Sequence, residues 1–299
     1  MDQILELLDS RGPLIGKELL ERTQMDEFTA WKICNSHERI VTKTIGTRYL
    51  RLDRQVEGYA RLSPSIIREF HGYTVIGTVR NIPDIQDKAE LLRQEIINIS
   101  KRKFELAQEV ITKIVGSQAT SNIIKAGACF IIAGDVAYEM AHLEPRPEPS
   151  TGELVRGSDL DIVVVTQGLP VSIVKALDYH IYEQKNFLLR NPSYNEEIDY
   201  IIKDISKVKE QLKFNSFKSM VASKILYEGK FLYGNIDIFN NIKKMLMDER
   251  IPEKIRALEE TASRNRNEAI AHLLNYEGKL TNEEDMKLFY TKEEKEEFL

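Results

Sequence analysis

One ten-residue stretch, residues 156–165, constrains the fold of this chain more than any other part of its sequence. It reads Arg-Gly-Ser-Asp-Leu-Asp-Ile-Val-Val-Val, and its apolar end predicts a strand that is buried on both faces. Asp159 and Asp161 stand two residues apart, so on a strand their side chains share one face. Two neighbouring carboxylates at the edge of a buried sheet repel each other unless a cation neutralises them, and Mg²⁺ prefers such oxygen ligands. The pair is therefore a candidate metal site.

Composition and charge favour a soluble globular protein of two or three domains in the cytoplasm. The chain has 299 residues, of which 42% are hydrophobic and 30% are charged, as is typical of globular proteins. Its first residues lack the order of a signal peptide, and no apolar run reaches the length of a membrane-spanning helix. Cys34 and Cys129 lie in different expected elements, which indicates buried thiols in a reducing compartment. The net charge of −5 gives no general attraction to nucleic acid or to a membrane.

The first 58 residues form a small unit in this interpretation. Their hydrophobic spacing predicts three helices and then two strands, over residues 2–9, 16–22, 26–36, 40–45 and 47–52. The two strands flank Gly46, and we expect them to pair as a β-hairpin. This order resembles a winged helix-turn-helix domain over roughly residues 1–55, and the resemblance implies DNA binding through the third helix and the hairpin.

Charge in this unit does not favour DNA over other partners. Residues 1–60 carry nine Lys and Arg against ten Asp and Glu, and the expected third helix has only Lys32 as a basic residue. The expected hairpin adds Lys43, Arg48 and Arg51. Phosphate contacts dominate the affinity for DNA, so a DNA-binding unit should be locally basic. DNA binding and a protein–protein role, including assembly into a homo-oligomer, therefore both stay open.

The rest of the chain divides into three further segments. Residues 59–118 are expected to form a linker and a long helix, because neither Gly nor Pro interrupts the helical spacing from Asp84 until Gly116. Residues 119–205 should hold a sheet core, and residues 206–299 a mostly helical region. Besides the aspartate strand, the core should contain a strand with a Gly turn and helix, a loop, a helix and a last strand, over residues 128–142, 143–156, 171–187 and 196–202.

The order of motifs in this core resembles the polymerase-beta-like nucleotidyltransferase superfamily. Gly134 closes the first strand, Gly-Ser-Asp-Leu-Asp opens the second, and Asp199 stands on a later strand. The resemblance covers about residues 85–205, and residues 217–234, which end in Leu-Tyr-Gly, are similar to a segment of many bacterial members. It implies a mixed α+β fold with a central mixed sheet flanked by helices, after an N-terminal winged helix and before a C-terminal helical region.

The same resemblance implies a Mg²⁺-dependent nucleotidyltransferase that moves a nucleoside monophosphate from an NTP to an acceptor hydroxyl. ATP is the first candidate for this NTP. Asp159, Asp161 and Asp199 would be its catalytic residues and the ligands of two metal ions, which stabilise the attacking and leaving oxygens. Glu197 shares a strand face with Asp199 and is a reserve ligand. The acceptor stays open among a protein, an RNA such as a tRNA end, a small molecule and a second nucleotide.

Several further residues are candidates for binding the nucleotide. They are Gly134, Asp135, Gly157, Ser158 and Lys224, with Lys218 as a weaker candidate. Asp135 departs from the family pattern, in which a Ser follows the glycine and helps to hold the phosphates. An acidic side chain there repels a triphosphate unless it turns away or takes a metal, and its alternative role is that of a helix N-cap.

The spacing between the two motifs is also unusual, because 25 positions separate Gly134 from Asp159 where the family commonly has about ten. The insertion, residues 142–156, should hang over the site, where Arg146 or Arg156 could contact phosphate. It could equally serve as a lid or a dimer contact. Asp135 motivates a second hypothesis, a DNA-binding regulator whose nucleotidyltransferase fold senses nucleotide without turnover. A toxin- or antitoxin-like protein with a bound partner is a third.

Overall fold

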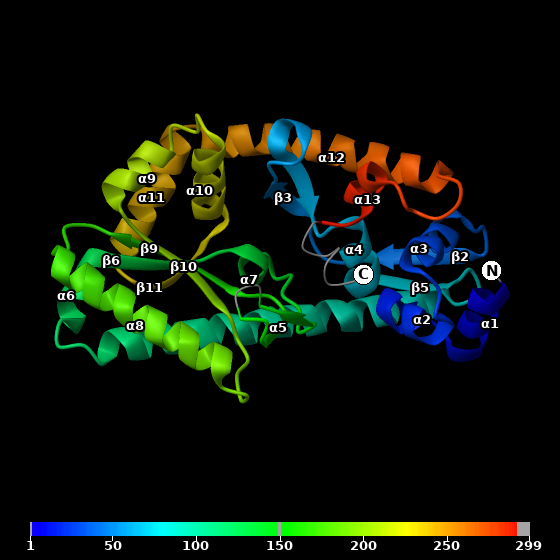
Figure 1. Cartoon of the computed structure of the whole chain (residues 1–299), viewed down its shortest axis with the longest axis horizontal. Coiled ribbons are helices and arrows are strands. Elements are labelled where there is room, and N and C mark those ends of the chain that lie inside the picture. Colours follow the sequence, from blue (N-terminus) through cyan, green and yellow to red (C-terminus); the bar gives the residue numbers. More distant parts are fainter. Residues whose placement is uncertain (1, 149–150, 292–299) are drawn as a thin grey trace. The chain divides into compact units, whose positions relative to one another are not determined.

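The computed structural model describes residues 2–148 and 151–291 and has a mixed α and β fold (Figure 1). The chain forms two compact units: Met1–Glu95 with Leu258–Leu299 make up unit 1, and Ile96–Ala257 make up unit 2. The division differs from the four successive segments expected from the sequence, because the last helices pack into the core of the N-terminal unit. No helix among the described residues is both long and apolar enough to cross a membrane.

The three helices expected at the start of unit 1 are confirmed. They are α1 Asp2–Arg11, α2 Gly16–Thr23 and α3 Glu27–Ser36. Asp26 caps α3, because its side chain accepts a hydrogen bond from the Thr29 amide at 3.0 Å. Trp31 and Cys34 are buried in the core of this unit, as the apolar face of α3 predicts.

The expected hairpin around Gly46 is wrong. Two strands do lie there, but each pairs with a segment further along the chain, in the antiparallel orders β1-β5-β2 and β3-β4. The strands are β1 Leu14–Ile15, β2 Ile40–Thr44, β3 Tyr49–Leu52, β4 Ala60–Ser63 and β5 Thr74–Thr78. β5 is buried along its whole length and fills the central position that a neighbouring hairpin strand would otherwise take. A short 3-10 helix, η1 Glu57–Tyr59, precedes β4, and α4 Ile66–Tyr73 precedes β5.

The C-terminal helices α12 Ile251–Asn275 and α13 Glu283–Phe289 complete the core of unit 1. Phe289 packs edge-on against Phe28 and Trp31 of α3, with ring centroids 5.6 and 5.4 Å apart. Such aromatic pairs bury large apolar surfaces. The N-terminal unit is therefore built from both ends of the described chain.

Unit 2 is built around a four-stranded sheet in the order β10-β9-β6-β11. Its strands are β6 Ala128–Ile132, β9 Leu160–Thr166, β10 Ile198–Asp204 and β11 Lys230–Gly234. β9 and β10 are parallel, and the other pairs are antiparallel. Residues 162–165 are buried, as their apolar run predicts, and so is every residue of β6. Cys129 lies in this buried strand.

Helices cover this sheet (Figure 1). They are α5 Ile82–Gly116, which begins in unit 1, α6 Ser121–Gly127, α7 Gly134–Tyr138, α8 Val171–Arg190, α9 Ile205–Gln211, α10 Phe217–Glu228 and α11 Ile236–Asp248. Buried residues of α5 and α8, such as Ile111 and Ile181, share one core with the sheet. The long helix expected before Gly116 and the helix expected over 171–187 are confirmed.

Two expectations for unit 2 need correction. The stretch 143–156 is not a plain loop, because β7 Pro145–Pro147 and β8 Leu154–Arg156 pair as antiparallel strands, while residues 149–150 lie outside the described part. The region after residue 205 is not helical throughout, because β11 pairs with the edge of β6. The last expected strand, 196–202, is found two residues later as β10.

Candidate functional site

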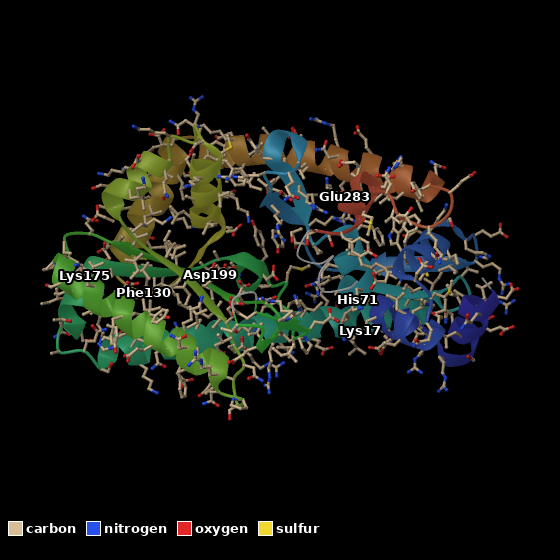
Figure 2. The ribbon with its side chains drawn as sticks, in the orientation of Figure 1. Lys17, His71, Phe130, Lys175, Asp199 and Glu283 are labelled. Atoms are coloured by element: carbon tan, nitrogen blue, oxygen red, sulfur yellow. The ribbon has the colours of Figure 1, made fainter. Side chains whose placement is uncertain are left out.

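The parallel register of β9 and β10 brings two of the predicted aspartates together. Asp199 lies directly opposite Asp161, and Asp159 precedes Asp161 by two residues. Asp199 is exposed, whereas Asp159 and Asp161 are partly buried at the point where β9 begins. In Figure 2 the labels of Asp199 and of Phe130 on β6 show where this sheet lies. All three predicted catalytic residues therefore lie at one end of two adjacent strands.

Gly134 packs directly on the carboxylate of Asp161. The Ala133 amide donates to the Asp161 carbonyl oxygen at 2.9 Å, which fixes the turn after β6 beside the start of β9. Gly134 has a φ of +63°, and a Cβ built on it would lie 2.0 Å from Asp161 Oδ2. Both the left-handed backbone and the close approach require glycine at this position. The predicted strand-closing glycine is therefore part of the same site.

The turn after Gly134 is held by Ser158. Its hydroxyl donates to Asp135 Oδ2 at 2.7 Å and accepts from the His142 amide at 3.2 Å. The Ser158 amide itself donates to the His142 carbonyl oxygen, and the Gly157 amide donates to that of Val155. Ser158 is buried, and both amides that were candidates for phosphate are hydrogen-bonded within the fold. Asp135 is not the N-cap of α7, because Ala133 takes that position and Asp135 lies in the first turn.

Arg146 reaches the site from β7. Its Nη2 lies 2.8 Å from Glu197 Oε2 and 3.8 Å from Asp159 Oδ1, and its Nε donates to the Gly157 carbonyl oxygen at 3.0 Å. The insertion therefore places Arg146 beside Asp159 and Glu197, and contact of this arginine with phosphate stays a prediction. Arg156, the other one, is exposed. Glu197, the expected reserve ligand, is paired with Arg146.

Lys224 and Glu228 approach the site from α10. Lys224 forms an ion pair with Glu228 one turn further along the helix, and its Nζ lies 5.2 Å from the centre of the Tyr138 ring. Glu228 Oε1 accepts a hydrogen bond from the Gly134 amide at 3.2 Å. The predicted Lys224 is thereby placed next to the glycine turn, whereas Lys218 is exposed. Sequence reasoning missed Glu228, although its spacing of four residues from Lys224 on one helix was a usable signal.

The resulting acidic cluster comprises Asp135, Asp159, Asp161, Asp199 and Glu228. Burial raises the pKa of Asp161 well above its ordinary value of 3.8, and the other four carboxylates raise it further. Burial also raises the pKa of Asp159, and Arg146 opposes that shift. The carboxylates of the cluster thus repel one another, which is the condition that a bound cation relieves.

The donor set decides which cation would fit. Every side chain of the acidic cluster offers carboxylate oxygens, and such hard donors suit Mg²⁺ better than a metal that prefers sulfur or nitrogen. Within residues 2–148 and 151–291, however, no three acidic, histidine or cysteine side chains already converge as a set of metal ligands. The carboxylate donors therefore suit Mg²⁺. The backbone register of β9 and β10 brings Asp161 and Asp199 side by side, but the carboxylates do not form a complete set of metal ligands.

A second charged pair lies beside the insertion and was not predicted. Lys103 of α5 is buried and lies 2.6 Å from Glu196 Oε2, and it donates a hydrogen bond to the Arg156 carbonyl oxygen at 2.8 Å. This contact ties the end of β8 to the residues just before β10. Its signal in the sequence was weak, because the two partners are 93 residues apart.

Comparison with known proteins adds no name to this site. A scan against models of known protein families finds no match to the chain. A search of curated proteins likewise finds no significant relative.

Proposed function

We propose that unit 2 is a nucleotidyltransferase of the polymerase-beta-like kind, which moves a nucleoside monophosphate from an NTP to an acceptor hydroxyl. The observation that carries this proposal is the parallel register that sets Asp199 beside Asp161, two residues after Asp159. The contact of Gly134 with the Asp161 carboxylate supports it, because it joins the end of β6 to the same point.

Asp159, Asp161 and Asp199 would hold the Mg²⁺ ions, since they offer hard oxygen donors at one end of two adjacent strands. A metal bound there would supply positive charge to the attacking and leaving oxygens of the transfer. The exposed Asp199 is suited to accept the proton of the acceptor hydroxyl, because it is open to solvent and to a second substrate.

In this proposal the nucleotide phosphates contact side chains rather than the loop amides. The amides of Gly157 and Ser158 are already hydrogen-bonded within the fold. Lys224 and Arg146 bring positive charge next to Gly134 and Asp159, and each can exchange a carboxylate partner for a phosphate oxygen. Asp135 is turned toward Ser158, which lessens its repulsion of a triphosphate.

We propose further that unit 1 is a winged-helix domain with an enlarged wing and that it regulates this enzyme. Three helices precede an antiparallel sheet of order β1-β5-β2, and β3, β4 and α4 are inserted between β2 and β5. We therefore keep a second candidate function, a DNA-binding regulator that senses nucleotide without turnover. The internally bonded amides favour it, because they leave fewer donors for a triphosphate.

The test is to incubate the full chain with each α-labelled NTP, Mg²⁺ and cell extract, and to follow both pyrophosphate and the labelled acceptor. We expect Asp159→Asn/Asp161→Asn to lose transfer while its circular dichroism spectrum is unchanged. Asp248→Asn, an exposed change of equal charge on α11, is the control and should keep full transfer.

Full turnover by the double variant would refute the enzyme hypothesis. Nucleotide binding by the wild type without pyrophosphate release, together with salt-dependent DNA binding that ATP alters, would select the regulator instead.

A further inference from the structure

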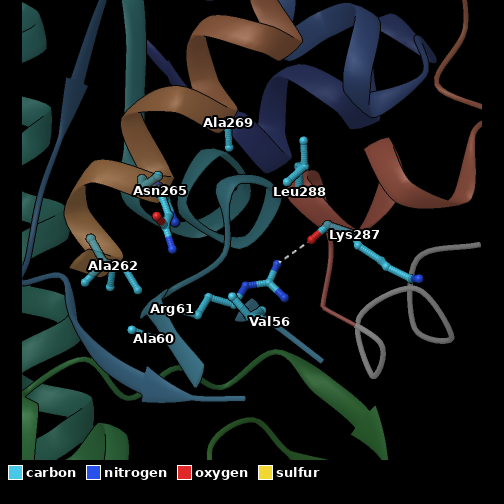
Figure 3. A pocket seen from close by; sticks show the side chains of 10 residues that line it. Val56, Ala60, Arg61, Ala262, Asn265, Ala269, Lys287 and Leu288 are labelled. Atoms are coloured by element: carbon cyan, nitrogen blue, oxygen red, sulfur yellow. Dashed lines mark hydrogen bonds between the residues drawn. The ribbon is translucent and has the colours of Figure 1, made fainter. Parts of the chain in front are cut away.

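Unit 1 contains a pocket that has no part in the proposed transfer site. One face of α12 forms one side of it, through Ala262, Asn265, Arg266 and Ala269, which recur at helical spacing. Val56 and residues 60–62 of β4 face them, and Lys287 and Leu288 of α13 close one end (Figure 3). We call this the basic pocket; it encloses about 430 Å³ of space, including the part open to solvent.

The most unusual group in the basic pocket is Arg266. Only 7% of this residue is exposed. Its Nη1 donates to the Pro64 carbonyl oxygen at 2.6 Å, and its Nη2 lies 3.2 Å from Glu69 Oε1. Neither its Nε nor its Nη2 has a hydrogen-bond partner among the described residues, although Nη2 is within ion-pair distance of Glu69. Buried guanidinium donors without acceptors are costly, so the site is short of acceptors.

The neighbouring charges do not supply those acceptors. Glu69 also accepts two hydrogen bonds from Arg48, at 2.5 and 2.9 Å, so one carboxylate serves two guanidinium groups. Arg61 Nη1 lies 3.7 Å from Asp53 Oδ2. Its Nη2 donates hydrogen bonds to the carbonyl oxygens of Lys287 and Tyr290. Burial together with the charges of Arg48 and Arg61 lowers the pKa of Arg266, and Glu69 opposes that shift.

We propose that the basic pocket binds a small organic anion, a carboxylate or a phosphate that carries an apolar body. The charged head would meet Arg266, whose Nε offers the open donor, with Arg61 and Asn265 beside it. The apolar body would lie against Leu62, Ala269 and Leu288, which line the same space. The small size of the space favours a compact metabolite.

Calorimetric titration of the full chain at low salt tests this, with phenyl phosphate, benzoate and the uncharged benzamide as probes. We expect saturable one-to-one binding of phenyl phosphate, of benzoate or of both, and at least tenfold weaker binding of benzamide. A preference between the first two distinguishes a phosphate from a carboxylate head. Arg266→Lys keeps the charge but removes the open donor, and Ala262→Leu fills the space; each should weaken binding at least tenfold.

Arg264→Lys is the matched control, because it makes the same substitution as Arg266→Lys at an exposed position of the same helix, and it should leave binding within twofold. Asp159→Asn/Asp161→Asn should also keep full binding, so a failure of the transfer hypothesis leaves this test intact. The proposal is overturned if no anionic probe binds the folded wild type at about 10 mM. Equal binding of benzamide, or unchanged binding by a folded Ala262→Leu variant, would overturn it as well.

Discussion

Two groups of charged side chains in unit 2 differ in how well their charges are neutralised by their neighbours. Lys103 and Glu196 have side chains only 3% and 9% exposed, and they neutralise each other at 2.6 Å. In the acidic cluster Arg146 lies 3.8 Å from Asp159 and Lys224 pairs with Glu228, yet the carboxylates still raise the pKa of Asp161. The two groups thus differ in how far their charges oppose one another.

The pKa shifts show the same contrast. Burial raises the pKa of Glu196 and lowers that of Lys103, and in each case the partner opposes the shift. Burial raises the pKa of Asp161 too, but there four carboxylates add to the shift. A pair that the fold neutralises by itself is suited to stability, whereas a cluster that the fold leaves charged is suited to an external cation.

The largest expected effect comes from breaking the neutralised pair. Lys103→Met should lower the free energy of unfolding by about 3–5 kcal/mol, because it leaves the Glu196 carboxylate buried without its counter-ion. Urea denaturation measures the loss. Lys101→Met is the control, since Lys101 is 71% exposed and should change stability by less than about 0.5 kcal/mol. Equal effects of the two variants would show that the pair is not a stabilising contact.

Lys203 of β10 is a third case, a buried cation whose side chain donates to a neutral acceptor, Gln211, at 3.1 Å. Burial lowers its pKa from 10.5 to about 8. The unfolded chain therefore binds this proton more tightly, and the penalty on the folded state is full below pH 8 and fades as the pH rises toward 10.5.

Lys203→Met should accordingly raise the free energy of unfolding by about 1–3 kcal/mol at pH 6, with a gain that shrinks by pH 10. Urea denaturation across this pH range measures it. Lys209→Met, at an exposed position of α9, should give no such trend. A gain that is independent of pH would mean that packing, rather than the charge of Lys203, sets the effect.

The parts of this site that can be predicted from the sequence depend only on residues that are close together in the chain. The apolar runs of β6 and β9, the aspartates before β9 and the glycine after β6 all follow from local spacing. Asp199 is predicted through the family resemblance, and the parallel pairing of β10 with β9, which a helix separates in the chain, places it beside Asp161.

The parts that escaped prediction depend on distant partners. β2 pairs with β5 instead of the adjacent β3, and β11 pairs with β6 about a hundred residues earlier in the chain. The same holds for Lys103 with Glu196, and for the return of α12 and α13 to the core of unit 1. Local periodicity identifies such elements but contains no information on which other element each one meets.

A smaller effect is expected from lowering the charge of the acidic cluster. The pKa of Asp161 is higher in the folded than in the unfolded chain, so the folded protein binds the proton more tightly and loses stability as the pH rises above 3.8. Asp161→Asn has no charge to bury and should raise the melting temperature at pH 7 by about 2–4 °C. Scanning calorimetry should show this gain vanish as the pH falls toward 3.8.

Mg²⁺ adds a second measurement to the same variant. It should raise the melting temperature of the wild type, because it binds the folded state, and should do so less for Asp161→Asn. Asp248→Asn is again the control and should behave as the wild type does. If the variant were less stable than the wild type at pH 7, the neighbours of the Asp161 carboxylate would stabilise the folded state and not destabilise it by repulsion.

The smallest effect concerns Arg146 of the insertion. This side chain lies between Glu197 and Asp159 and so competes with any added cation for the same carboxylates. At pH 8, Arg146→Gln should therefore tighten Mg²⁺ binding about two- to fivefold in a calorimetric titration, as expected for losing a partly exposed ion pair. Arg156→Gln on the neighbouring strand, an exposed change of equal charge, should leave the affinity unchanged. Weaker Mg²⁺ binding by Arg146→Gln would instead mean that the arginine holds Asp159 in place for the metal, and would move Arg146 from a competitor of the cation to a positioning residue of its site.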